Sequence, residues 1–293
     1  MGPIRGFNGM RLFSLMLLAF SGLLGQTSDP LSSAEDLYSH SDYQASLALI
    51  RLSEQASSKA YLLAGRDHYM LGDYKKAVEA LERAFAMEPS SSECALWLGR
   101  GYGRRGETSS LFSAPRYASK ARAYFEKAIA LDPDNQEALR DLFDYYLEAP
   151  GFLGGGYDKA ERIAKRIGDR NPADGLLAQA ELADRRKQFD SAEEQFGRAA
   201  QMASRQVGRV LDLARSLARQ GRISESEAAF DQAEQLEPNS PQVSFARART
   251  YIEQKRNLEQ ARALLIQYLR SNPTPDEPSR QQAEKLLKEA SGA

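Results

Sequence analysis

The chain has 293 residues and a formal net charge of −1, with 39 lysines and arginines against 40 acidic residues. Because 42% of the residues are hydrophobic and 27% are charged, the composition is typical of a folded protein rather than a disordered one. The two signs of charge alternate along most segments, which argues against a basic surface for nucleic acid, so no nucleic-acid partner is expected.

The N-terminus has the pattern of a targeting signal. Arg5 and Arg11 precede an uncharged apolar run at residues 12–25. This run has the length of the hydrophobic part of a secretory signal and is too short to span a bilayer comfortably. We therefore expect residues 1–26 to be a secretory signal peptide and the mature protein to be periplasmic or secreted. The alternative is an uncleaved N-terminal membrane anchor, which is the only membrane contact expected.

A repeat of about 34 residues becomes clear at residues 58–91. Bulky, small and aromatic side chains recur at fixed positions, and a proline follows the second half of the unit. The residues concerned are Tyr61, Gly65, His68, Gly72, Tyr74, Ala77, Leu81, Ala84 and Pro89. This pattern resembles the tetratricopeptide repeat (TPR). The resemblance implies an all-α, right-handed superhelical solenoid of helix-turn-helix units. The stretch at residues 139–163 also resembles segments of exported bacterial TPR proteins of unassigned role.

The resemblance extends over most of the chain and divides it into units. The predicted units are a degenerate N-terminal repeat or cap at 27–57, six repeats near 58–91, 92–135, 136–172, 173–206, 207–240 and 241–273, and a C-terminal capping helix and tail at 274–293. Each unit cannot bury its apolar face alone, so stability is expected to come from stacking on the neighbouring units.

Two consecutive repeats are longer than the others. The extra residues fall at 107–120 and 149–157, in the turn between the two helices of each unit. Pro150 and the glycines at 154–156 cannot continue a helix. Because stacked repeats place equivalent turns beside each other, the two insertions should lie side by side on one edge of the array.

The first helix of each TPR lines the concave surface in this family, which points to a first candidate binding surface. The residues that we expect there are Arg66, Tyr69, Arg100, Arg104, Arg140, Arg215, Arg219 and Arg249. Arginine forks bind carboxylates well, so one hypothesis is a groove for a partly hydrophobic protein segment with acidic groups. The alternative is that these arginines and the neighbouring acids form a solvated face. The lysine and asparagine of chaperone-binding TPR proteins are replaced by Leu62 and Arg66, so such a clamp is not supported.

The inserted segments provide a second candidate surface. Phe112, Arg116, Phe152 and Tyr157 could form an aromatic and basic patch that binds a partner. The alternative is that the two insertions cover each other and bury Phe112 or Phe152 against the hairpin ends.

Catalytic or metal-binding chemistry is not expected. Beyond the N-terminal segment the sequence offers only two histidines, His40 and His68, and one cysteine, Cys94, without the spacing of a metal site or of a nucleophile and its base. Cys94 falls in a helical pattern and is expected to be a small buried thiol, with a reactive or intermolecular thiol as the alternative. The chain is therefore predicted to be no enzyme and to hold no cofactor or metal.

The function that this sequence favours is a non-catalytic, exported scaffold or adaptor. It would bind a protein or peptide through the concave groove or the inserted edge, with envelope assembly or secretion as candidate processes. The alternative is recognition of an envelope glycan or lipid head group by the aromatic and basic patch of the insertions.

Overall fold

The computed structural model describes residues 29–52, 57–202, 206–271, 274 and 277–292; the predicted signal peptide lies outside them. These residues form fifteen α-helices and one 3₁₀ helix, and no β-strand occurs among them. The elements are α1 (Pro30–Ser39), α2 (Tyr43–Leu52), α3 (Ser58–Met70), α4 (Tyr74–Met87), α5 (Ser92–Glu107), α6 (Ala114–Leu131), α7 (Gln136–Glu148), η1 (Gly151–Leu153), α8 (Tyr157–Arg170), α9 (Pro172–Arg185), α10 (Phe189–Met202), α11 (Val207–Arg219), α12 (Ile223–Leu236), α13 (Pro241–Glu253), α14 (Leu258–Arg270) and α15 (Arg280–Ala290). The predicted all-α hairpin array is confirmed.

The α3–α4 hairpin shows how the repeat pattern forms its local structure. Ser57 caps the start of α3 by accepting a hydrogen bond from the amide of Ala60 at 3.1 Å, and Asp73 caps α4 in the same way. Gly72 between the helices has a φ of 77°, a conformation that favours glycine. The short turn and the capped helix starts therefore reverse the chain, so that α4 packs against α3.

Small residues allow the two helices of a hairpin to approach closely. A Cβ atom on Gly65 would lie 2.5 Å from the side chain of Leu81, and one on Gly99 would lie 2.7 Å from the ring of Phe125. Successive hairpins then pack their apolar faces together, and the fully buried side chains follow the array from Leu81 to Leu265. The core therefore consists of successive apolar clusters along the array, each formed by hairpins that stack on their neighbours, as the repeat resemblance implies.

The first insertion differs from the loop expected at 107–120. Helices α5 and α6 are 16 and 18 residues long, compared with 13 and 14 for α3 and α4. Most of the additional residues therefore lengthen the two helices, and only residues 108–113 connect them. Ala118 and Ala121 extend α6 along α5, beside the glycines of α5, so packing makes helix the better conformation for this stretch. The second insertion, in contrast, is irregular and consists of η1 with glycines on its C-terminal side.

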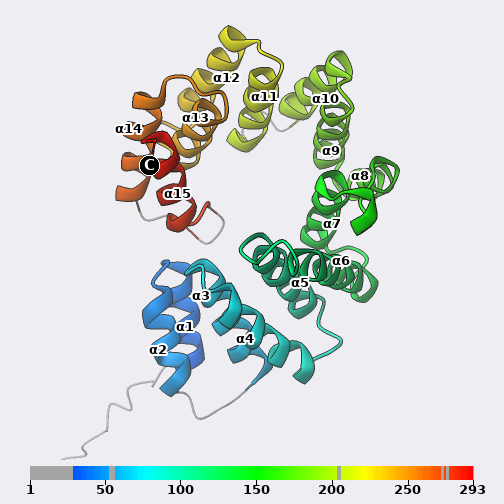
Figure 1. The fold of residues 1–293 in the computed structure, drawn as a ribbon, viewed down its shortest axis with the longest axis vertical. Coiled ribbons are helices and arrows are strands. Elements are labelled where there is room, and N and C mark those ends of the chain that lie inside the picture. The colour runs from blue at the N-terminus through cyan, green and yellow to red at the C-terminus, as the bar shows by residue number, and fades with distance from the viewer. Residues whose placement is uncertain (1–28, 53–56, 203–205, 272–273, 275–276, 293) are drawn as a thin grey trace, which may run out of the picture.

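The array curves until its two ends meet. Figure 1 shows the hairpins following a ring from the N-terminal helices α1–α4, in blue and cyan, to α15, in red, which returns to the side of α3. Contact across this junction is direct, since the hydroxyl of Tyr74 on α4 donates to Oε1 of Gln281 on α15 at 3.5 Å. The sequence predicted α15 as a cap on the last repeat; it also closes the ring.

Candidate functional site

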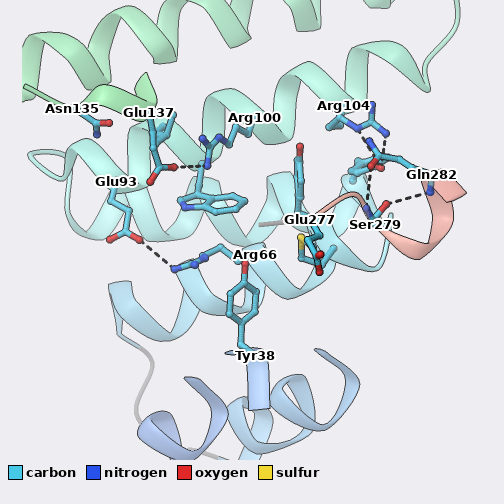
Figure 2. A pocket seen from close by; sticks show the side chains of 15 residues that line it. Tyr38, Arg66, Glu93, Arg100, Arg104, Asn135, Glu137, Glu277, Ser279 and Gln282 are labelled. Atoms are coloured by element: carbon cyan, nitrogen blue, oxygen red, sulfur yellow. Dashed lines mark hydrogen bonds and ion pairs between the residues drawn. The ribbon is translucent and has the colours of Figure 1, made fainter. Parts of the chain in front are cut away.

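Three of the predicted groove arginines line a cavity of about 460 Å³ at the junction of the two ends, here called the junction cavity. Arg66 comes from α3, and Arg100 and Arg104 lie one turn apart on α5. Glu277 and Ser279, which precede α15, line the same cavity, so both ends of the array contribute to it (Figure 2).

Arg66 and Arg100 are held by aromatic rings and carboxylates of this chain. The Arg66 guanidinium lies 4.5 Å from the ring centre of Tyr38 and 4.9 Å from that of Trp97, while Arg100 lies 4.8 Å from Trp97. Arg66 also pairs with Glu93 at 3.3 Å (Figure 2). Such stacked and paired guanidinium groups are positioned firmly, because cation–π contact and ion pairing act together.

The carboxylate partners of Arg100 come from the following repeat. Nη1 of Arg100 lies 2.9 Å from Glu137, and Nε donates to Asp141 at 2.6 Å. Burial lowers the pKa of Arg100, but the adjacent Asp141 outweighs this effect and the pKa is raised overall. Arg100 therefore stays charged, and its charge is already matched.

Arg104 is anchored to α4. Its Nε and Nη2 donate to the hydroxyl of Tyr74 at 3.3 and 3.1 Å, and its guanidinium lies 5.1 Å from the Tyr74 ring centre. Arg104 also pairs with Glu107, one turn further along α5. Tyr69 lies edge-on to both Trp97 and Tyr74, and burial raises its pKa to about 12. The aromatic and basic side chains of this region thus form one connected layer.

The other predicted groove arginines lie around a second cavity of about 440 Å³, and each pairs with an acid. These pairs are Arg140 with Glu181 at 2.6 Å and Asp144 at 3.1 Å, Arg215 with Asp212, Arg219 with Asp184 at 2.7 Å, and Arg249 with Glu253 at 2.7 Å. Burial raises the pKa of Glu181 to about 7, although Arg140 opposes this effect. A ligand carboxylate on this surface would have to compete with the chain's own acids.

The sequence analysis did not identify the acidic residues that pair with these arginines, although the repeat pattern contains a signal for them. Glu93 and Glu137 both occupy the second position of their repeat, and each pairs with an arginine at position 9 of the repeat before. That regular relation between neighbouring repeats would have identified the pairing. The geometry agrees with the alternative in which arginines and acids form a charge-balanced inner face.

The two inserted segments line a mostly apolar hollow of about 700 Å³, here called the loop groove, which shares Arg100 and Arg104 with the junction cavity and Asp144 with the second cavity. Small residues of α5 and α6 lie along it, and Leu111 and Pro115 from the first insertion line it together with Phe152 and Leu153 from the second. The two insertions therefore lie side by side, as expected. The small residues concerned are Gly103, Gly106, Ala114, Ala118 and Ala121.

Hydrogen bonds fix the second insertion beside α6 and α7. The carbonyl oxygen of Leu153 accepts from the hydroxyl of Tyr145 at 2.8 Å and from Nη1 of Arg122 at 3.4 Å. Gly154 has a φ of 88°, and a Cβ atom there would meet Arg122, so the glycine permits this close approach. Phe152 is thus held on a defined turn next to the groove.

The four predicted patch residues do not share one cavity. Phe152 lines the loop groove and is 83% exposed, and Phe112 is 98% exposed beside Leu111, which is 90% exposed. The exposure of both phenylalanines contradicts the alternative in which the insertions bury them. Tyr157 donates to the carbonyl of Arg185 at 3.4 Å, and neither it nor the exposed Arg116 lines the groove. Leu111, by contrast, was missed although it adjoins Phe112.

The remaining sequence candidates are buried or dispersed. Cys94 is buried and its Sγ lies 3.6 Å from the hydroxyl of Ser58. Burial lowers the pKa of His68, an effect that Asp73 partly opposes. Over the described residues, histidine, cysteine and acidic side chains form no cluster of three that could hold a metal ion. In the same part of the chain, no helix combines the length and apolar character needed to cross a membrane.

Comparison with known proteins gives matches of two kinds. Sequence models described as tetratricopeptide repeat match residues 58–91, 117–135 and 211–278. A tetratricopeptide repeat protein from Parabacteroides merdae is similar in structure, with a TM-score of 0.61 and 15% identity over 89% of this chain and 97% of that one. A thermophilic TPR protein of Thermus thermophilus has a TM-score of 0.53 and 22% identity over 64% of this chain and 97% of that one. No curated protein matches the sequence.

Proposed function

This chain belongs to the tetratricopeptide repeat family, whose domains generally bind protein partners, and we propose that it is an exported, non-catalytic scaffold that binds an apolar segment of a partner protein in the loop groove. The observation that carries this proposal is the exposure of Leu111 and Phe152 in a groove lined by both insertions, with Phe112 exposed next to Leu111. Large apolar side chains gathered on a surface generally mark an interaction site.

The energetics favour the loop groove over the second cavity. Covering Leu111 and Phe152 would contribute about 1.5–3 kcal/mol for each side chain. Around the second cavity, a ligand would first have to displace acids that already pair with Arg140 and Arg219. The partly exposed Gly103, Ala114 and Ala118 leave room for a partner backbone to approach. A segment with two or three apolar side chains fits this surface.

Recognition of a glycan or lipid head group by the insertions has no comparable support, because Arg116 and Tyr157 do not line the groove with Phe152.

Export is supported by the sequence of the N-terminal segment, where two arginines precede the apolar run 12–25. Sequencing the N-terminus of the protein recovered from the exported fraction would test export. A start near residue 27 is expected, and an intact N-terminus in the cytosolic fraction would contradict it.

Site-specific photocrosslinking tests the groove. A photoreactive phenylalanine analogue replaces Phe152, and we expect it to capture a discrete protein in the native host. Leu111→Ser should reduce that capture at least tenfold, because it removes the facing apolar wall. The matched control is Ile266→Ser on α14, where the isoleucine is 42% exposed and lies outside the groove. Equal capture by Leu111→Ser and the unsubstituted chain, or equal loss with Ile266→Ser, would refute the proposal.

A further inference from the structure

The junction between the two ends of the array is formed differently from the packing between neighbouring repeats in the described residues. Neighbouring repeats join through buried apolar side chains such as Leu81, Leu98 and Phe125. Across the junction, the hydroxyl of Tyr74 donates to the side chain of Gln281, a residue exposed on α15, at 3.5 Å. At 3.5 Å this O–H···O contact is longer than usual, so it shifts an equilibrium by no more than the factor of roughly two to ten expected for a neutral hydrogen bond.

Two cavities flank this contact, so the junction is loosely packed. The junction cavity of about 460 Å³ lies on the side of Ser279 and Gln282 (Figure 2). A second cavity of about 610 Å³ is lined by Tyr43, Met70 and Leu71 from the N-terminal end and by Pro278, Arg280 and Gln281 from the C-terminal end. Because both sides of the contact remain hollow, the junction lacks the close packing that makes an interface permanent.

At one point of the junction, a glycine of the first repeat makes room for a side chain of α15. Gly72, in the turn before α4, lies against Gln281, and a Cβ atom on Gly72 would be 1.9 Å from Oε1 of that glutamine. The glycine therefore leaves the space that the Gln281 side chain occupies. Gly221 has the same place in its own repeat and nearly the same φ, 78° against 77°, yet nothing lies within 4 Å of its Cβ position.

A chain of polar contacts connects the junction to the loop groove. The Tyr74 hydroxyl donates to Gln281 and accepts from Arg104, and Arg104 pairs with Glu107. Both Arg104 and Glu107 line the loop groove, while Arg104 also lines the junction cavity. Movement of Gln281 away from Tyr74 would therefore remove a hydrogen bond from the hydroxyl that holds Arg104, a residue shared by both sites.

We propose that the two ends of the array form a reversible latch, and that opening the latch alters the loop groove through Arg104. The second part rests on the proposed function of the groove, whereas the latch itself does not. The ring is closed when Gln281 lies on Gly72 and Tyr74, and it opens by separation of α15 from α3 and α4. The apolar clusters of the repeats stay intact in both states.

Spin-label distances test the latch without any partner. Labels on Lys75→Cys of α4 and Lys288→Cys of α15, in a Cys94→Ala background, report the separation of the two ends by pulsed electron resonance. We expect a short distance population in the unsubstituted junction and a shift to longer, broader distances with Gly72→Ala. Gly221→Ala carries the same backbone strain and should leave the distances unchanged. Absence of the short population, or an equal response to both alanines, would overturn the latch.

A second pair of variants leaves the backbone of the turn untouched. Gln281→Ala removes the acceptor of the Tyr74 hydrogen bond and should also lengthen the distances, while Lys285→Ala, exposed on the same helix, should not. An environment-sensitive dye on Phe112→Cys then reports on the loop edge. An emission shift with Gln281→Ala and none with Lys285→Ala supports coupling. An opened ring with unchanged emission would overturn the coupling and leave the latch in place.

Discussion

Single side chains in this array carry charges that burial makes costly. Asp67 on α3 is fully buried, and its Oδ2 accepts a hydrogen bond from Ser46 of α2 at 2.8 Å. Within the described residues, Oδ1 has no hydrogen-bond partner. Burial raises the pKa of Asp67 from 3.8 to about 7, against the opposing effects of Ser46 and Arg66. This residue joins the N-terminal hairpin to the first clear repeat.

The raised pKa predicts a pH-dependent stability. Between about pH 4 and 7 the folded chain binds a proton at Asp67 that the unfolded chain has lost, so the free energy of unfolding falls as pH rises through this window. Asp67→Asn should remove this dependence and stabilise the protein by roughly 1–3 kcal/mol at pH 8, with little change at pH 4. Urea unfolding at the two pH values measures the effect. Asp169→Asn, at an exposed position, is the control, and parallel pH profiles for the two variants would contradict the prediction.

At the scale of the helix, small residues decide how closely a hairpin can pack. Gly99 and Gly103 lie one turn apart on α5 and both face α6, but their surroundings differ. A Cβ atom on Gly99 would lie 2.7 Å from the Phe125 ring, whereas the nearest atom to a Cβ on Gly103 would be the Ala121 Cβ at 4.0 Å. At position 99 a side chain larger than glycine would clash with Phe125, whereas position 103 has room for alanine.

This contrast predicts opposite effects of one substitution. Gly103→Ala should stabilise the protein by about 0.5–1 kcal/mol, because alanine loses less backbone entropy in a helix and here meets no clash. Gly99→Ala should destabilise it by about 1–3 kcal/mol, since Phe125 must move within a packed core. Thermal unfolding of the two variants beside the unsubstituted protein gives the comparison. A loss of stability in both would show that the space at Gly103 is not available.

At the scale of the whole molecule, α15 has two separate roles. It covers the last hairpin, where Ala283 packs with the buried Leu265 and Tyr268, and it contacts the first repeats through Gln281. The first role is apolar and contributes stability to the end of the array, as terminal repeats commonly do. The second is polar and determines whether the ring is closed.

Removing α15 should therefore do more than opening the junction. A chain that ends at residue 278 should show a larger radius of gyration by X-ray scattering and a lower Tm, because the apolar cluster around Leu265 becomes exposed. Gln281→Ala should increase the radius with little change in Tm. If both variants lowered Tm equally, the hydrogen bond to Tyr74 would have to be a main source of stability rather than a latch.

The sequence by itself determined the hairpins and their order. Caps such as Ser57 and Asp73, close-packing glycines such as Gly65, and the interval of about 34 residues act within a hairpin or between neighbours, so they can be interpreted locally. It also located the two insertions, and adjacent repeats placed them together. The pairing of Arg66 with Glu93 lies one repeat away and was within reach of the same pattern.

Only the tertiary structure decided which parts of the first insertion became helix, which side chains of the insertions stayed exposed, and where the ends of the array met. Phe112 and Phe152 are exposed because of the conformation of the short turns that carry them. A repeat pattern does not specify that conformation. The contact of Tyr74 with Gln281 depends on small rotations between hairpins that accumulate over the whole array. No single repeat encodes that sum, and so neither the ring nor its junction could be predicted from the sequence pattern.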